Sequence, residues 1–308
     1  MSVSSLPLVR WRLAQLASHL VVALIALVVV GGATRVMEAG LACPDWPLCF
    51  GSFLPGRQMN LQVFLEWFHR LDAFLIGIAF FVQLAVAVVF KTQLPKRLIW
   101  IYGFMLFLVG VQGALGALTV LKLLPSMIVT AHLILALTLV ALMSAVAQEL
   151  LQCDDSSPPR GWRVMGLSSL FMVLGQCIIG GRMSTTWSSQ ICLSQGEKCQ
   201  LLDLHRISAM PVALVLLTFV VTSIGVGGWS RTQWPLLLIV VFMLAIQVLL
   251  GITSVHTGLS EPVVTVGHQL VAAILVALLA ALSSRRPDAL DPKVSEIVNE
   301  SLFEACHG

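Results

Sequence analysis

The chain has 308 residues, of which 58% are hydrophobic and only 11% are charged. Soluble globular domains carry about 25% charged residues, so most of the surface of this chain must face lipid, which excludes both an ordinary soluble domain and a disordered chain. The net charge of +3 is too small to indicate a nucleic-acid partner. We therefore expect a protein of the lipid bilayer that binds no nucleic acid.

Eight apolar segments follow one another along the chain, and each is close to the roughly 20 residues that a helix needs to cross a bilayer. None alternates with the period of two that is typical of a membrane β-barrel strand. The sequence therefore predicts an all-α membrane protein with eight transmembrane helices. They fall at about 13–34, 66–90, 98–121, 126–148, 163–182, 203–226, 235–255 and 263–284.

The basic residues predict the orientation of the chain. With eight spans, both termini and the second, fourth and sixth loops lie on one side, and that side holds eleven of the 18 Lys and Arg residues. The positive-inside rule identifies this side as the cytoplasm. The stretch before the first span is too short for a mitochondrial transit peptide. We therefore expect a multi-pass protein of a bacterial plasma membrane with both termini in the cytoplasm.

The start of the chain has a second interpretation. Two arginines near the N-terminus, an apolar stretch and the small residues at 31–33 together resemble a signal peptide with its cleavage site. A similar Gly-Gly-Arg ending recurs at 180–182, deep in the chain, where no signal peptide can act. The pattern is therefore better interpreted as the outer end of a helix.

The second half of the sequence repeats the first. Matching residues recur at an offset of 149 in Gly32/Gly181 and Cys43/Cys192, and at an offset of 136 in His69/His205 and His132/His268. Because each unit contains four helices, an even number, both copies run in the same direction. The repeat predicts two parallel, pseudo-symmetric four-helix bundles, over 1–150 and 151–285, followed by a cytoplasmic tail at 286–308.

Four histidines occupy matching positions near the outer ends of the even-numbered spans. They are His69, His132, His205 and His268. Ionisable side chains within spans usually face the interior of a bundle, so two pairs at a common depth predict a metal ion or haem between them. A structural zinc site needs four ligands, whereas haem iron needs only one imidazole on each side. The alternative for a single membrane histidine is an interhelical hydrogen bond, but the duplication favours iron.

Other polar residues accompany these histidines. Arg70 and Arg206 directly follow the first histidine of each pair, so they are candidates for contacts with haem propionates, with anchoring at the membrane interface as the alternative. Gln112 and Gln247 are expected to make interhelical hydrogen bonds.

Two pairs of cysteines lie in loops on the predicted outer side. An extracytoplasmic compartment is oxidising, so we expect the disulfides Cys43–Cys49 and Cys192–Cys199. Each would fix the local shape of a short loop. Small exposed disulfides can also exchange with a thiol donor and act as redox relays, which is the functional alternative.

One acidic residue breaks the symmetry of the repeat. Glu66 lies three residues before His69 and so shares its helix face, whereas the equivalent position before His205 is Leu202. A carboxylate at the edge of a haem pocket can accept or donate a proton, which makes Glu66 a candidate catalytic residue. The alternative is a carboxylate that stabilises the helix N-terminus. If Glu66 is catalytic, the first bundle performs the chemistry and the second only holds a cofactor.

Taken together, these residues resemble the haem A synthase family. The likeness is carried by Gly-Gly-Ala-Thr-Arg at 31–35, Cys-Pro-Asp-Trp-Pro-Leu-Cys at 43–49 and Glu-Trp-Phe-His-Arg at 66–70, with the three later histidines in order. It covers essentially the whole chain from the first span to the eighth.

The resemblance implies a membrane oxidoreductase that oxidises the C8 methyl group of haem O to a formyl group and so makes haem A for cytochrome oxidase. It implies that His69 and His132 bracket haem O, that Glu66 assists catalysis, and that His205 and His268 bind a b-type haem as cofactor. The partners it implies are haem O synthase, cytochrome oxidase assembly factors and an electron-transfer partner that the sequence does not identify.

Two other classes of function stay open on the residues alone. A dihaem b-type membrane electron carrier without substrate chemistry would have symmetric pockets and would give no reason for a single Glu66. A transporter whose histidines relay protons would contain no haem and would be expected to have helices broken at mid-membrane, whereas only Pro211 falls within a predicted span.

Overall fold

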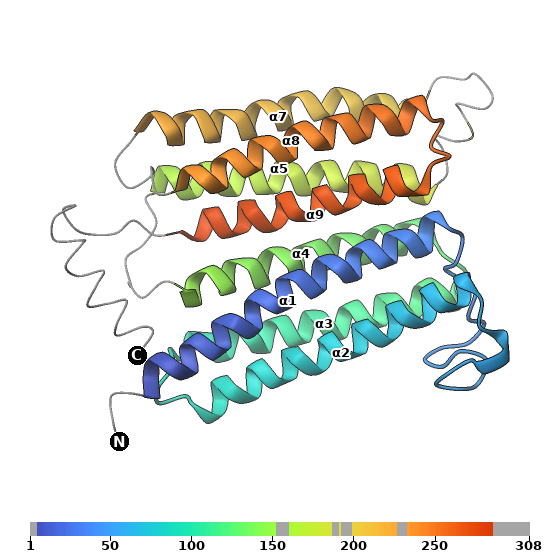
Figure 1. Ribbon diagram of the computed structural model, residues 1–308, viewed down its shortest axis with the longest axis horizontal. Coiled ribbons are helices and arrows are strands. Elements are labelled where there is room, and N and C mark those ends of the chain that lie inside the picture. Colours follow the sequence, from blue (N-terminus) through green and yellow to red (C-terminus); the bar gives the residue numbers. More distant parts are fainter. Residues whose placement is uncertain (1–4, 152–159, 187–190, 192–198, 227–232, 286–308) are drawn as a thin grey trace.

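The computed structural model describes residues 5–151, 160–186, 191, 199–226 and 233–285. This part of the chain contains eight long α-helices and no strand, which confirms the predicted all-α membrane fold (Figure 1). All eight are long and apolar enough to cross a membrane. They are α1 (Ser5–Val36), α2 (Leu61–Val89), α3 (Arg97–Leu121), α4 (Ser126–Leu151), α5 (Arg160–Thr185), α7 (Gln200–Val226), α8 (Trp234–His256) and α9 (Pro262–Ser284), with a short 3-10 helix η1 (Gly56–Gln58) before α2.

Several helices begin before the predicted spans. One of them is α2, which begins at Leu61 rather than at 66 and has a mostly apolar first turn. The side chain of Asn60 caps this helix by accepting the backbone N–H of Val63 at 2.9 Å. The extra turn places Glu66 inside the helix rather than at its start.

The helices form two groups that lie side by side (Figure 1). In the first group α1 packs on α2 and α4, and α3 packs on both α2 and α4, which closes a ring of four. In the second group α5, α7, α8 and α9 form a ring in the same way. The two rings meet where α9 packs on α1 and α4 and where α4 packs on α5. The division of the chain into domains near residue 150 and a symmetry axis relating the rings both stay predictions.

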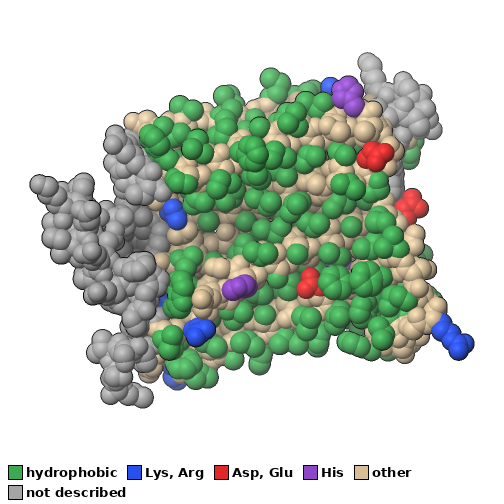
Figure 2. Space-filling model, viewed as in Figure 1, with side chains coloured by type: hydrophobic (Ala, Val, Ile, Leu, Met, Phe, Trp, Pro, Cys, Tyr) green, Lys and Arg blue, Asp and Glu red, His purple; other side chains and the backbone are tan. Residues whose placement is uncertain are grey.

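Polar contacts join the helices near the junction of the rings. The Ser144 hydroxyl of α4 donates to the carbonyl oxygen of Ala277 of α9 at 2.7 Å, and the indole N–H of Trp162 of α5 donates to that of Leu282 at 2.7 Å. The outer helices instead present apolar side chains to lipid, and Trp100 of α3 is 81% exposed. Figure 2 shows hydrophobic side chains over most of one face, with most of the charged ones near its two ends.

Candidate functional site

The second helix group brings His205 of α7 and His268 of α9 face to face. The centroids of the two imidazole rings lie 6.4 Å apart, with their planes at 66°. An imidazole nitrogen binds a metal ion at about 2 Å and each ring adds roughly 1 Å to its centroid, so two rings on opposite sides of one ion are about 6 Å apart. The spacing of this pair therefore fits a single iron between two axial histidines.

The first helix group brings together His69 of α2 and His132 of α4, whose imidazole rings lie close enough to interact electrostatically. Each ring has a buried Nδ1 atom that finds no hydrogen-bond partner in the described part of the chain. A buried polar atom without a partner is costly, and binding to an iron would satisfy such a ring nitrogen. This pair therefore also fits a haem, on the evidence of its unsatisfied nitrogens.

Each of the four histidines packs against a glycine of the preceding helix. A methyl group added at the glycine would lie 2.9 to 3.3 Å from Cε1 of the imidazole, which is closer than side chains normally approach. The pairs are Gly31 with His69, Gly116 with His132, Gly180 with His205 and Gly251 with His268. This role was not predicted from the sequence. The detectable signal was the recurrence of these glycines in the two halves of the chain. Gly31 recurs as Gly180 at an offset of 149, and Gly116 recurs as Gly251 at an offset of 135.

Three glutamines contact the same rings from one helical turn before the glycines. Gln112 Nε2 lies 3.4 Å from His132 Nε2, and Gln247 Nε2 lies 3.2 Å from His268 Nε2. These contacts confirm the predicted interhelical hydrogen bonds. A third glutamine, Gln176, was not singled out by the sequence, although its Nε2 lies 3.1 Å from Nδ1 of His205.

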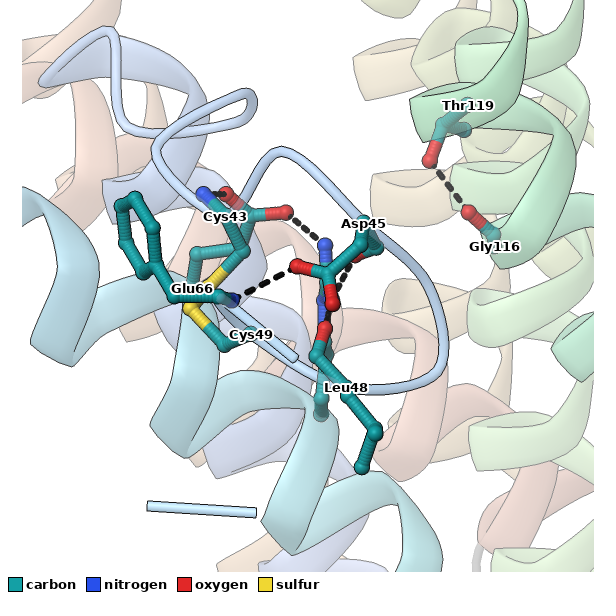
Figure 3. A network of polar contacts seen from close by, with 9 residues as sticks. Cys43, Asp45, Leu48, Cys49, Glu66, Gly116 and Thr119 are labelled. Carbon is teal, nitrogen blue, oxygen red and sulfur yellow. Dashed lines mark hydrogen bonds and ion pairs between the residues drawn. A yellow bond between two sulfur atoms is a disulfide. The ribbon is translucent and has the colours of Figure 1, made fainter. Parts of the chain in front are cut away.

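Glu66 is buried and bonded to the loop between α1 and α2. One carboxylate oxygen accepts the backbone N–H of Cys43 at 2.8 Å (Figure 3), and the other forms an ion pair with Arg70. The predicted disulfide between Cys43 and Cys49 is present. Because Glu66 lies inside α2 and bonds to the loop, the structure does not support a carboxylate that serves the helix N-terminus.

Arg70 attaches this loop to α2. Its guanidinium donates to the carbonyl oxygens of Asp45 at 2.7 Å and Leu48 at 2.6 Å, in addition to its ion pair with Glu66. The Asp45 carboxylate in turn accepts the backbone N–H groups of Phe50 and Gly51. Arg70 is thus directed at the loop, and its contact with a haem propionate stays a prediction.

The second group differs at the matching positions. Leu202, at the position equivalent to Glu66, is buried in an apolar cluster with Cys199. Glu66 instead bonds to the loop between α1 and α2. Arg206 is exposed, and in the described part of the chain it makes no hydrogen bond or ion pair that would fix its side chain, so its propionate contact also stays a prediction. Cys192 and the tail at 286–308 lie outside the described residues, and the disulfide Cys192–Cys199 is therefore untested.

These observations define a class of protein: a multi-pass helical membrane protein with two histidine pairs that each fit an iron. Residues 14–280 match the COX15-CtaA family, described as cytochrome oxidase assembly protein. The chain belongs to this family.

Curated relatives carry a more specific name. The haem A synthase of Shewanella oneidensis is 29% identical over 54% of this chain and 55% of its own, and that of Caulobacter vibrioides is 29% identical over 50% and 56%. The haem A synthase of Sphingopyxis alaskensis is 30% identical over 86% of this chain and 89% of its own. The chain thus spans about half the length of the first two relatives and most of the third.

Proposed function

We propose that this protein is a haem A synthase, a membrane oxidoreductase that oxidises the C8 methyl group of haem O to a formyl group and so provides haem A for cytochrome oxidase. The observation that carries the proposal is the inequality of the two histidine pairs. Among the described residues Glu66 is the only buried carboxylate, and it lies three residues before a histidine of the first pair only. The family and the names of the relatives support the same function.

The two pairs take different haems in this proposal. His69 and His132 hold the iron of haem O, the substrate, while His205 and His268 hold a b-type haem as cofactor. When bound, that haem supplies one-electron transfer within the protein. Residues 1–150 thus form the substrate domain and residues 151–285 the cofactor domain.

Glu66 contributes a proton-transfer group at the outer end of the substrate pocket. Its Oε1 and Oε2 atoms are held by Arg70 and by the Cys43 amide, so the carboxylate has one fixed orientation. A positioned carboxylate accepts or gives up protons as the methyl group is hydroxylated twice and the resulting gem-diol loses water to give the formyl group. Fixing it through the loop keeps that group in one place relative to His69.

The proposed setting is a bacterial plasma membrane, with both termini in the cytoplasm and the Cys43–Cys49 loop outside. The proposed partners are haem O synthase, cytochrome oxidase assembly factors and an electron-transfer protein or carrier. A dihaem electron carrier is the competing function. It is disfavoured because it gives no reason for a buried carboxylate beside one histidine pair and not the other.

Haem analysis tests the proposal directly. We expect the purified protein to give a b-type reduced-minus-oxidised spectrum, and cells that make both haem O and this chain to yield formyl haem on extraction. Cells with the haem O source alone are the control. A purified protein with a normal b-type spectrum and no hydroxylated or formyl haem in the cells would leave the electron carrier as the better function.

A further inference from the structure

The residue one helical turn before each histidine-contacting glycine is the same in three helices and different in the fourth. Gln112, Gln176 and Gln247 each precede their glycine by four positions, and in α1 that position is Leu27. Leu27 and Gln176 are 149 residues apart, the offset that also relates the glycines of α1 and α5. They are therefore equivalent positions of the two halves that carry different side chains.

The three glutamines restrain their imidazoles. Gln176 shows this most fully, because its Nε2 contacts the ring of His205 and donates to the backbone carbonyl of the same residue at 2.6 Å. Its Oε1 accepts the hydroxyl of Ser208 at 2.7 Å, so the amide is held at both ends. A ring that contacts such an amide can leave its orientation only by giving up hydrogen bonds inside the membrane.

His69 lacks a side-chain restraint of this kind. In the described part of the chain its ring is hydrogen-bonded to the backbone carbonyl of Leu27 but to no glutamine side chain, and its buried Nδ1 has no hydrogen-bond partner. The leucine side chain cannot hydrogen-bond to an imidazole. Groups that orient a histidine ligand commonly change metal affinity by about 10- to 100-fold, so this difference is large enough to separate a held ligand from an exchangeable one.

We infer that Leu27 makes His69 the releasable iron ligand of this protein. In the first pocket His132 stays fixed by Gln112 while His69 turns away, so that haem O enters and haem A leaves on the His69 side. In the second pocket Gln176 and Gln247 restrain both ligands, and the haem is retained. The inference rests on the proposed function, because only an enzyme that exchanges substrate for product needs one pocket that releases its haem.

A reciprocal exchange of the two residues tests the inference. The variants are Leu27→Gln and Gln176→Leu, with Leu27→Met as the matched apolar control. Each is purified with iron protoporphyrin IX in both pockets, and the rate of haem transfer to excess apomyoglobin is followed by absorbance. The wild-type protein should show one faster and one slower phase, and a His205→Ala background identifies the phase of the first pocket.

Leu27→Gln should slow the fast phase about tenfold or more, Gln176→Leu should speed the slow phase to a similar extent, and Leu27→Met should change neither. Rates unchanged in both exchange variants would overturn the inference. If Leu27→Gln does not fold, Gln176→Leu alone decides, since an unchanged slow phase in that variant contradicts the role given to the glutamine.

The assay separates this inference from the proposed function. Haem transfer is measured with a haem that the enzyme does not convert, so it does not depend on catalysis. Normal haem A formation together with unmoved transfer rates would overturn the inference and leave the function standing. If the transfer rates change as expected in Leu27→Gln and Gln176→Leu but the protein forms no haem A, the proposed function is overturned and the difference in haem release between the two pockets stands.

Discussion

The imidazole of His205 lies directly on Gly180 of the preceding helix, where a methyl group would come within 3.1 Å of its Cε1 atom. The absence of a side chain at Gly180 thus allows α5 to approach the ring of a proposed haem ligand. The same relation recurs at the other three histidines, which makes the glycines part of the site.

Gly180→Ala should therefore displace the ring of His205 and lower the amount of b-type haem that is purified with the protein. We expect a loss of affinity of about tenfold or more, as for other residues that orient a metal ligand. The ratio of haem to protein, from absorbance, measures it. Gly175→Ala is the matched control in the same helix, because a methyl group there would meet nothing within 4 Å. Equal haem content in the two variants would contradict this role.

His205→Ala should remove the b-type haem, because it deletes one of the two axial ligands of the second pocket. His69→Ala should leave that haem in place, since it lies in the other helix group. Reduced-minus-oxidised spectra of the two purified variants make the comparison. Full retention of the b-type signal in His205→Ala would refute the assignment of the second pocket.

Glu66→Gln should keep the b-type haem and lose haem A formation, by about a hundredfold or more, because an amide cannot transfer the proton. Extraction of haems from cells that make haem O measures the product. Glu149→Gln is the control, since Glu149 is also paired with an arginine, Arg97 at 2.6 Å, at the opposite ends of the helices. Unchanged product with Glu66→Gln would remove the catalytic role.

Arg70→Ala should loosen the loop between Cys43 and Cys49, because it removes the donors to two loop carbonyl groups and the ion-pair partner of Glu66. Hydrogen exchange of the peptide that covers residues 41–50 should become faster. Arg57→Ala, at an exposed arginine of the same connection, should leave that exchange unchanged. If both variants exchange like the wild-type protein, Arg70 does not hold the loop.

Ser144→Ala should destabilise the contact between the two helix groups by about 0.6 kcal/mol, which is typical of an interhelical hydrogen bond in a membrane protein. The lost bond is the 2.7 Å contact with the carbonyl of Ala277. Unfolding in mixed detergent measures the difference. Ser169→Ala is the control, because that hydroxyl bonds within its own helix, to Met165. An equal loss in both variants would show that the contact between the groups adds no stability.

The sequence predicts the helices well because the signal is repeated over some 20 residues in each span. It also predicts Cys43–Cys49 and the interhelical bonds of Gln112 and Gln247, since these residues are either close in sequence or duplicated. Comparison of the halves could not detect Gln176, because its equivalent is Leu27, and a repeat reveals only what is retained in both copies.

The arrangement around Glu66 could not be predicted for a different reason. Its partner is a backbone amide 23 residues away, in Cys43, and Arg70 bonds to carbonyl groups of the same loop. Backbone groups are present at every residue, so their pairing leaves no trace in residue types. Only the path of the loop determines which of them meet a side chain of α2.

That path has a further consequence for the outer end of the first helix group. The side chains of Glu66, Arg70 and Asp45 all bond to main-chain groups of the loop. The side chains of Trp46, Leu48 and Phe50 are therefore not needed for attachment and are 39 to 44% exposed. Substitutions of these three side chains can therefore change the outward surface of the loop while the carboxylate of Glu66 keeps its position.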